Sequence, residues 1–521
     1  MIILWILIIL ISIIIIGFII SRNKANEQRK IPKAFLTDSH SPPKIILLVL
    51  DSLMDEPLKK AIQENKAPAL AFFLKNGQYS KNLVSSFPTM SVTIDSSLIT
   101  GTYPNQHKIP GLVWFDDDKK QIITYGNGFF EILKLGFSNF AENIMHRYNN
   151  VDLNPKVKTI HEDLAQDKRK TASINALIYR GYDHHTLKVP KPIAKVSVLP
   201  EEYETTGPKM LSLGAFIRQD PNNKHIVKRL GLNDAFAVQE LKYLLEKNIL
   251  PEFTIMYLGE NDHTVHKKGP TTTKGIEKLD KHLQEVLNMF PQWEDALNNY
   301  IWVIIGDSYQ SSVKKDKKEA LINLKEILSD YRVLKLGKAV SKDDDIVITA
   351  NERMAYIYKI NESLSLENIA QTLQTDSRIG WIAWKVNEMI HVISGAHEGS
   401  LIYNSGGPDK DVYNQTWSLK GNLSILDLTI KNKQIEYGDY PDGLARLYGA
   451  IHSQQGEFLI VDAKPGYEFI GESSPQHSGG AAHGSMHKAD SLAPFIVTGT
   501  NKSIDGLRMV DLKKWILDIL N

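Results

Sequence analysis

Three short apolar runs, each followed closely by an aspartate, constrain the fold of this chain more than any other feature. The runs IILLVL, FTIMYL and IWVII lead to Asp51, Asp262 and Asp307 respectively. Continuous apolar runs of this length are typical of strands buried on both faces of a parallel sheet. Ligands of such sheets bind at the carboxyl ends of the strands, so the three aspartates are candidate binding residues. The alternative role for an aspartate after a strand is a cap on the next helix.

The composition excludes several kinds of site. The 521 residues contain no cysteine, which excludes disulfides, thiolate zinc sites and cysteine nucleophiles. A net charge of +1 argues against a basic surface that binds nucleic acid. Any metal ion must therefore be held by histidine, aspartate and glutamate.

A dense set of hydroxyls lies in the stretch FPTMSVTIDSSLITGTYPNQHKIPG, at positions 87–111. Thr89, Ser91 and Thr93 come at the start of an apolar periodic run, which is a signal for the beginning of a helix. The unpaired N–H groups and the dipole at such an end favour an anion, including a phosphate and the alkoxide that attacks it. Most hydroxyl caps bind nothing, so this stretch alone is weak evidence for a catalytic role. The other motifs of the chain strengthen it.

Histidines with metal-ligand spacing follow in two places. Asp262 and His266 are four residues apart, so their side chains can meet on one face of a helical turn. His477, His483 and His487 lie in a short glycine-rich segment between two apolar runs. Carboxylate and imidazole ligands without thiolate suit zinc or a similar divalent ion. The alternatives are a surface Asp–His pair and loop histidines bonded to nearby backbone.

These motifs, in this order, resemble the alkaline phosphatase superfamily, and most closely the type I phosphodiesterase/nucleotide pyrophosphatase family. The stretch at 87–111 is similar to the family's nucleophile segment. Counting back from Thr100 and Gly101 places the family's nucleophile at Ser91, with Thr89 and Thr93 as alternatives.

The resemblance implies two sites for divalent metal ions. The first would consist of Asp262, His266 and His483, with zinc as the expected ion. The second would be weaker and built on Asp51, Asp307 and the Ser91 oxygen. The family has a histidine after the aspartate of the third run, where this chain has Ser308. The remaining oxygen ligands suit manganese or magnesium, or else His477 enters the second site.

The expected fold is α/β: a mostly parallel central sheet with helices on both faces, like alkaline phosphatase, plus an inserted α+β cap and an N-terminal transmembrane helix. We expect a transmembrane anchor at 1–21, a tether at 22–43, a catalytic domain in two parts at 44–308 and 441–521, and the cap at 309–440.

The anchor prediction rests on Met1 to Ile20, an almost wholly apolar run without charge. About 20 such residues span a hydrocarbon core of about 30 Å. Basic residues follow the run and none precede it, which by the positive-inside rule favours a cytoplasmic catalytic domain. The family resemblance favours the extracellular side.

The expected function is hydrolysis of a phosphodiester or nucleotide-type small molecule through a covalent phospho-enzyme on Ser91. Two other functions fit the sequence. One is transfer of a phospho-headgroup from lipid to an acceptor, although such enzymes usually have several membrane spans. The other is ligand binding on a scaffold that has lost its activity, for which Ser308 is the main indication.

Removal of residues 1–41 should yield a soluble and active enzyme, because this segment contributes no motif residue. Cell fractionation and a diesterase assay on the truncated protein check this. A truncated protein that folds but is inactive would show that the segment does more than localise the enzyme.

Overall fold

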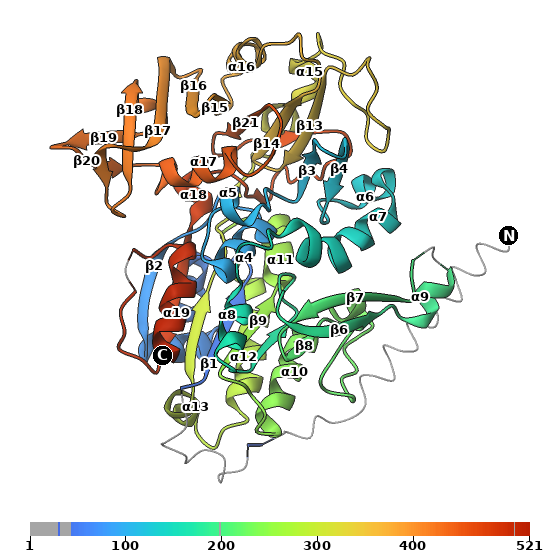
Figure 1. Ribbon diagram of the computed structural model, residues 1–521. Coiled ribbons are helices and arrows are strands. Elements are labelled where there is room, and N and C mark those ends of the chain that lie inside the picture. Colours follow the sequence, from blue (N-terminus) through green and yellow to red (C-terminus); the bar gives the residue numbers. More distant parts are fainter. Residues whose placement is uncertain (1–29, 32–42, 197–198, 505) are drawn as a thin grey trace.

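The computed structural model describes residues 30–31, 43–196, 199–504 and 506–521. They form two sheets with their helices, one stacked above the other in Figure 1. The expected anchor at 1–21 lies outside the described residues. Within the described ranges, no helix has both the length and the apolar character needed to cross a membrane.

The central sheet has seven strands and is mixed. Strand β1 pairs in parallel with β9 and β10, so that Leu47 lies between Ile255 and Val303. The α/β class is therefore confirmed, whereas β24 runs antiparallel to both of its neighbours. In spatial order the strands are β2 (Gln78–Val84), β24 (Leu492–Thr498), β10 (Ile301–Ile305), β1 (Ile45–Leu50), β9 (Phe253–Leu258), β5 (Thr171–Ile174) and β8 (Met210–Ser212).

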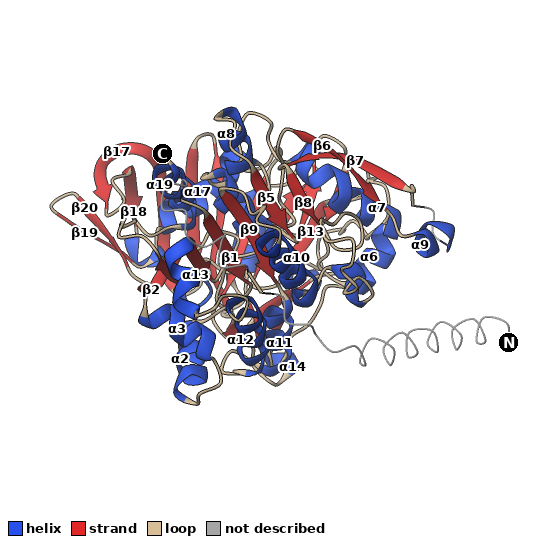
Figure 2. Ribbon diagram, turned by 90° about the horizontal axis from the view of Figure 1, so that it is seen from below, coloured by secondary structure: helices blue, strands red, loops and turns tan. Residues whose placement is uncertain are grey.

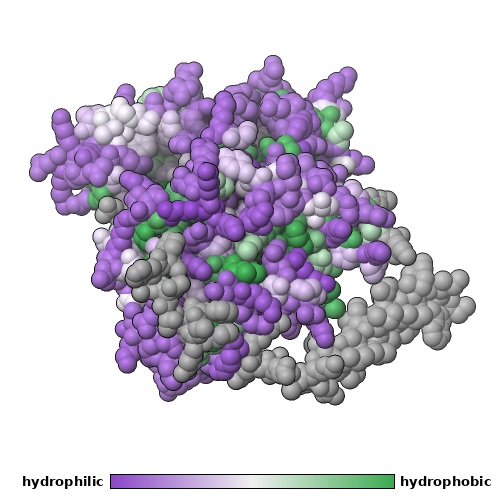
Figure 3. Space-filling view, turned by 60° about the horizontal axis from the view of Figure 1, so that its bottom comes forward, coloured by the Kyte–Doolittle hydropathy of each residue, from purple (hydrophilic) through white to green (hydrophobic). Residues whose placement is uncertain are grey.

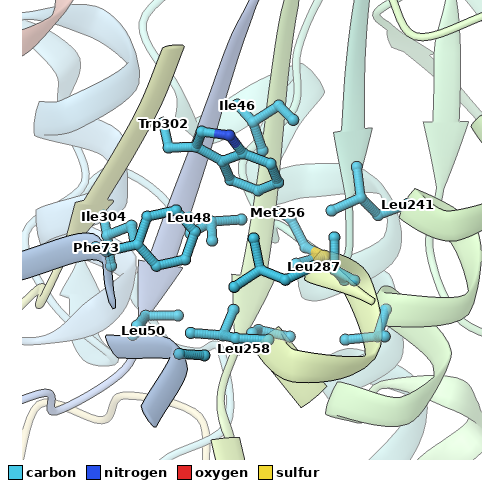
Figure 4. Packing of buried hydrophobic residues seen from close by; sticks show 14 of the residues in the cluster. Ile46, Leu48, Leu50, Phe73, Leu241, Met256, Leu258, Leu287, Trp302 and Ile304 are labelled. Atoms are coloured by element: carbon cyan, nitrogen blue, oxygen red, sulfur yellow. The ribbon is translucent and has the colours of Figure 1, made fainter. Parts of the chain in front are cut away.

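Helices cover both faces of this sheet (Figure 2). Because side chains alternate along a strand, Leu48 of β1 packs on one face and Leu47 on the other. Figure 4 shows the first face, where Phe73 and Leu241 pack against the strands. Each such side chain contributes about 1.5–3 kcal/mol when fully buried. The first face packs against α3 (Pro68–Lys75), α10 (Asp234–Glu246), α12 (Lys274–Leu287) and α13 (Trp293–Asn299), and the second against α4 (Ser91–Thr100), η2 (Asn143–Asp152), α8 (Ile160–Gln166) and α19 (Leu512–Leu520).

The second sheet belongs mainly to the inserted region. Helices α16 (Leu366–Gln374) and α17 (Gly443–Ile451) pack on its opposite faces. Its strands are β13 (Ile346–Asn351), β14 (Met354–Lys359), β21 (Phe458–Ala463), β15 (Ile379–Val386), β16 (Met389–Ser394), β17 (His397–Asp411), β20 (Gln434–Tyr437) and β19 (Leu428–Lys431), with β18 (Thr416–Gly421) paired to β17.

Strand β21 extends this second sheet past residue 440, the end that the sequence indicates for the insert. It lies between β14 and β15, antiparallel to both. Its run FLIVDA is buried throughout, and a fully buried run is compatible with either sheet. The sequence pattern alone therefore does not show which of the two sheets this run joins.

The remaining elements are short helices and two-stranded ladders. The helices are α2 (Asp55–Gln63), α5 (Pro104–His107), α6 (Phe129–Leu135), α7 (Phe137–Glu142), α9 (Lys191–Val196), η3 (Lys228–Gly231), α11 (Glu260–Lys268), α14 (Lys317–Ala320), α15 (Leu324–Ile327), η4 (Leu423–Leu426), α18 (Lys488–Ser491) and η5 (Met509–Asp511). The ladders pair β3 (Val113–Asp116) with β4 (Gln121–Thr124), β6 (Asp183–Lys188) with β7 (Glu202–Gly207), β11 (Ser311–Ser312) with β23 (Ala481–Ala482), and β12 (Leu321–Asn323) with β22 (Glu468–Ile470). Hydrophilic residues predominate on the face shown in Figure 3.

Two fully buried arginines connect the second sheet to the loop between β23 and β24. Arg353, in the turn between β13 and β14, forms an ion pair with Asp490 and donates to Ser311 Oγ at 2.6 Å. Arg446 of α17 donates to Met486 O at 3.0 Å and to Ser491 Oγ at 2.7 Å. Both sheets are therefore fixed to one loop.

Replacement of Arg353 by methionine should lower the free energy of unfolding by about 3–5 kcal/mol, because it leaves the Asp490 charge buried and unpaired. Chemical denaturation measures the loss. Arg332→Met is the control, since Arg332 is more than half exposed in its pair with Asp345 and the change should cost about 1 kcal/mol or less. Equal losses in the two variants would contradict this account of the junction.

Candidate active site

Two aspartates predicted from strand ends lie at the carboxyl ends of β1 and β10. Ser52 joins them: its N–H donates to Asp307 Oδ1 at 2.9 Å, and its hydroxyl lies 3.3 Å from Asp51 Oδ1. The Ser308 N–H also donates to Asp307 Oδ1, at 2.7 Å. In the described part of the chain, Asp307 Oδ2 is buried and has no hydrogen-bond partner. This oxygen is a candidate ligand atom.

Helix α11 follows β9 directly and carries the Asp–His pair. His266 Nε2 lies 3.2 Å from Asp262 Oδ1, as expected for residues one helical turn apart. Ser52 Oγ and Gln310 Nε2 also donate to Asp262 Oδ1, at 3.0 and 2.6 Å. The pair is therefore connected to the carboxyl ends of β1 and β10.

Backbone oxygens orient two of the imidazoles. His266 Nδ1 donates to Ala481 O at 2.8 Å, and His483 Nδ1 donates to Thr89 O. In each ring this bond leaves Nε2, rather than Nδ1, to bind a metal ion, the arrangement that orients metal-bound histidines. Ligand atoms of Asp262, His266 and His483 all lie within 4.8 Å of one another. The structure thus brings together the three residues expected at the first metal site.

Asp51 and Asp307 are buried acidic side chains. Burial and the charges of Asp307 and Asp262 hold the pKa of Asp51 well above its usual range. Burial also raises the pKa of Asp307. Tyr257 donates its hydroxyl hydrogen to Asp51, and among the described residues no lysine or arginine forms an ion pair with Asp51 or Asp307. A divalent cation would balance these carboxylates.

His266 is protonated at neutral pH when no metal is bound. Burial lowers its pKa, but the charges of Asp262 and Glu352 outweigh burial and raise it to about 10. Because a ligating imidazole must be neutral, metal binding at His266 releases a proton.

The three candidate nucleophiles differ in exposure. Thr89 is fully buried: its hydroxyl donates to Ser485 O at 3.1 Å and accepts from the Gly484 N–H at 2.7 Å. Thr93 is also fully buried. Ser91, the first residue of α4, is partly exposed, and the helix has no side-chain cap.

Helix α4 carries an acidic side chain, Asp95, near Asp307. Asp95, four residues after Ser91, is buried, and burial together with the charge of Asp307 raises its pKa. Sequence reasoning did not single out Asp95, because the family usually has other residue types in the run that follows its nucleophile.

The structure places His477 beside the first site. Its ring stacks on that of His266 with centroids 4.4 Å apart, and its Nδ1 lies 3.0 Å from Glu468 Oε2. One alternative drawn from the sequence has His477 enter the second site, at Asp51 and Asp307. In the described ranges, the metal-ligand group that includes His477 is completed by His266 and Glu352.

Sequence reasoning missed Glu352 and Glu468. Glu352 lies in the turn between β13 and β14, and Glu468 is the first residue of β22. Neither belongs to a recognisable metal motif. The available signal was weak: an acidic residue in a hairpin turn, and a buried acidic residue at the start of a strand.

Comparison with known proteins assigns the family. The sequence profile of "Type I phosphodiesterase / nucleotide pyrophosphatase" matches residues 45–486. This chain is a member of that family. The family resemblance drawn from the motifs is confirmed, and this type I phosphodiesterase/nucleotide pyrophosphatase family member is a phosphoric ester hydrolase of the alkaline phosphatase superfamily. The family is typically dependent on divalent metal ions.

Solved structures agree with the fold. Murine ectonucleotide pyrophosphatase/phosphodiesterase 5, an inactive variant in complex with AMP, is similar with a TM-score of 0.52 and 13% identity, over 92% of this chain and 95% of that chain. Phosphonoacetate hydrolase from Sinorhizobium meliloti 1021, in complex with phosphonoacetate, is similar with a TM-score of 0.54 and 13% identity, over 92% and 96%. A search against curated protein sequences gives no significant match.

Replacement of Gly480 by alanine should weaken metal binding by about 10- to 100-fold, the usual effect of disturbing a group that orients a ligand. An added Cβ would lie 1.9 Å from the His266 carbonyl oxygen, so the end of α11 must shift. Competition with a chromophoric chelator measures the affinity. Gly471→Ala is the control, because its Cβ meets Ala350 only at an ordinary 3.5 Å. A Gly480→Ala protein that folds and binds metal like wild type would contradict the expected geometry.

Proposed function

We propose that this family member hydrolyses phosphodiester or nucleotide-type small molecules with Ser91 as the nucleophile and divalent ions as cofactors. The observation that carries the proposal is the position of Ser91. Of the three candidate hydroxyls it alone is partly exposed, and it begins the helix whose Asp95 is close enough to Asp307 for the two charges to interact.

The residues present fit the expected ions. Asp262, His266 and His483 would hold the first, in the three-ligand arrangement that zinc adopts in catalytic sites. Asp51 and Asp307 would hold a second ion together with the Ser91 oxygen, and their oxygen ligands suit manganese or magnesium. Bound divalent ions supply Lewis-acid stabilisation of the phosphoryl oxygens and of the attacking and leaving oxygens.

The chain's own residues account for the remaining chemistry. Ser91 Oγ forms a bond to phosphorus, the bond from phosphorus to the leaving oxygen breaks, and the hydroxyl proton of Ser91 passes through solvent to the leaving oxygen. Water then attacks the phosphorus, the Oγ–P bond breaks, and the serine is restored with a proton. The free N–H groups at the start of α4 favour the phosphoryl anion in both steps.

The substrate class is supported by the family, and AMP in a structurally similar protein is consistent with it. We also propose that residues 1–21 anchor the enzyme in a membrane, supported by the uncharged apolar run from Met1 to Ile20. The side of the membrane would be decided by protease protection on intact cells.

Ser91→Ala should lower turnover of bis-p-nitrophenyl phosphate by several orders of magnitude without changing the melting temperature. Thr93→Ala, two residues along the same helix, is the matched control and should retain turnover. Acid quenching of the wild type during turnover, followed by peptide mass spectrometry, should find phosphate on Ser91. Full activity of the Ser91→Ala protein, or phosphate on another residue, would exclude this nucleophile.

A further inference from the structure

Glu352 brings a carboxylate from the inserted region into the first metal site. Its Oε1 lies 3.8 Å from His266 Nε2, and its Oε2 accepts a hydrogen bond from the His483 N–H at 3.0 Å. The separation from His266 Nε2 matches the 3.9 Å between His483 Nε2 and Asp262 Oδ1, two of the expected ligands. Donors bound to one ion through bonds of about 2.1 Å lie about 3–4 Å apart. Glu352 Oε1 therefore lies at a separation from His266 Nε2 that two donors of one ion can have.

The surroundings of Glu352 are those of a ligand rather than a surface carboxylate. The side chain is buried, and no lysine or arginine in the described part of the chain forms an ion pair with it. Its backbone has φ of 57°, in the left-handed region that glutamate rarely adopts. Residues held in such conformations are concentrated at ligand and catalytic sites, where their surroundings fix them.

His477 is presented to the same place. Its backbone N–H donates to Glu468 Oε1 at 2.6 Å, and its Nδ1 donates to Glu468 Oε2. Glu468 is fully buried, so it fixes the ring firmly and leaves Nε2 free. A carboxylate that holds Nδ1 of a histidine is a recurring partner of metal-bound imidazole.

His266 connects this group to the first site. Ligand atoms of His266, Glu352 and His477 lie within 4.8 Å of one another, as do those of Asp262, His266 and His483. Because His266 Nδ1 is bonded to Ala481 O, only Nε2 can bind metal, and one nitrogen lone pair binds one ion. An ion bound at His266 Nε2 would therefore belong to both groups, which share only that residue.

We propose that Glu352 and His477 are additional ligands of the ion at His266, so that the first site has three imidazole and two carboxylate donors drawn from both sheets. The site is then five-coordinate or higher, and the insert is part of the metal centre. This inference rests on the proposed function, since it requires an ion at the first site.

The cobalt form of the full-length protein tests the proposal. One equivalent of Co²⁺ gives weak visible absorption in a site of five or six ligands and intense absorption in a four-coordinate site. The wild type should give the weak spectrum. Glu352→Gln and His477→Gln should each intensify it and weaken Co²⁺ affinity by about tenfold or more. Glu472→Gln is the matched control, because Glu472 lies near His477 in the chain and pairs with Lys134 at the surface.

The outcomes separate this inference from the proposed function. An intense four-coordinate spectrum in the wild type, unchanged in Glu352→Gln and His477→Gln, would overturn the inference. If Asp262→Asn abolished tight binding in the same series, the three-ligand site and the proposed function would stand. Failure of the wild type to bind Co²⁺ or Zn²⁺ at all would overturn both.

Discussion

The burial of carboxylates at the carboxyl edge of the central sheet is the constraint on which the site depends. Asp51 and Asp307 follow adjacent parallel strands, and Asp262 follows the next strand, so the topology forces like charges together. Tyr257 and Ser52 donate hydrogen bonds to Asp51 and Asp307, and the His266 imidazole lies beside Asp262. Such a cluster is costly without cations, so the proposed metal dependence follows from the fold.

The second sheet is as much part of this site as the first. The turn between β13 and β14 lies against the loop that carries His483, and the Arg353–Asp490 pair fixes it there. The same loop donates from the Gly484 N–H to Thr89, just before the proposed nucleophile. Nucleophile, imidazoles and insert are thus held by one segment, and movement of the insert would alter the metal site directly.

The sequence predicts those site residues that stand next to a recognisable pattern in the chain. Asp51, Asp262 and Asp307 follow apolar runs, and parallel strands place such residues at one edge whatever the strand order. Glu352 could not be found in this way, because a hairpin turn carries no sign of what it packs against. His477 was identified as a candidate ligand, but the sequence could not show which ion it approaches, since the position of a loop depends on tertiary packing. The run that forms β21 could not be assigned to either sheet for a similar reason: a fully buried strand has no face that identifies its partner.

Anomalous diffraction from crystals of the full-length protein grown with zinc tests the central claim most directly, because it locates the ions without reference to activity. The account predicts an anomalous peak at zinc-bond distance, about 2.0–2.2 Å, from His266 Nε2, between Asp262 and His483. Crystals that contain zinc at other positions but show no peak beside His266 would contradict it.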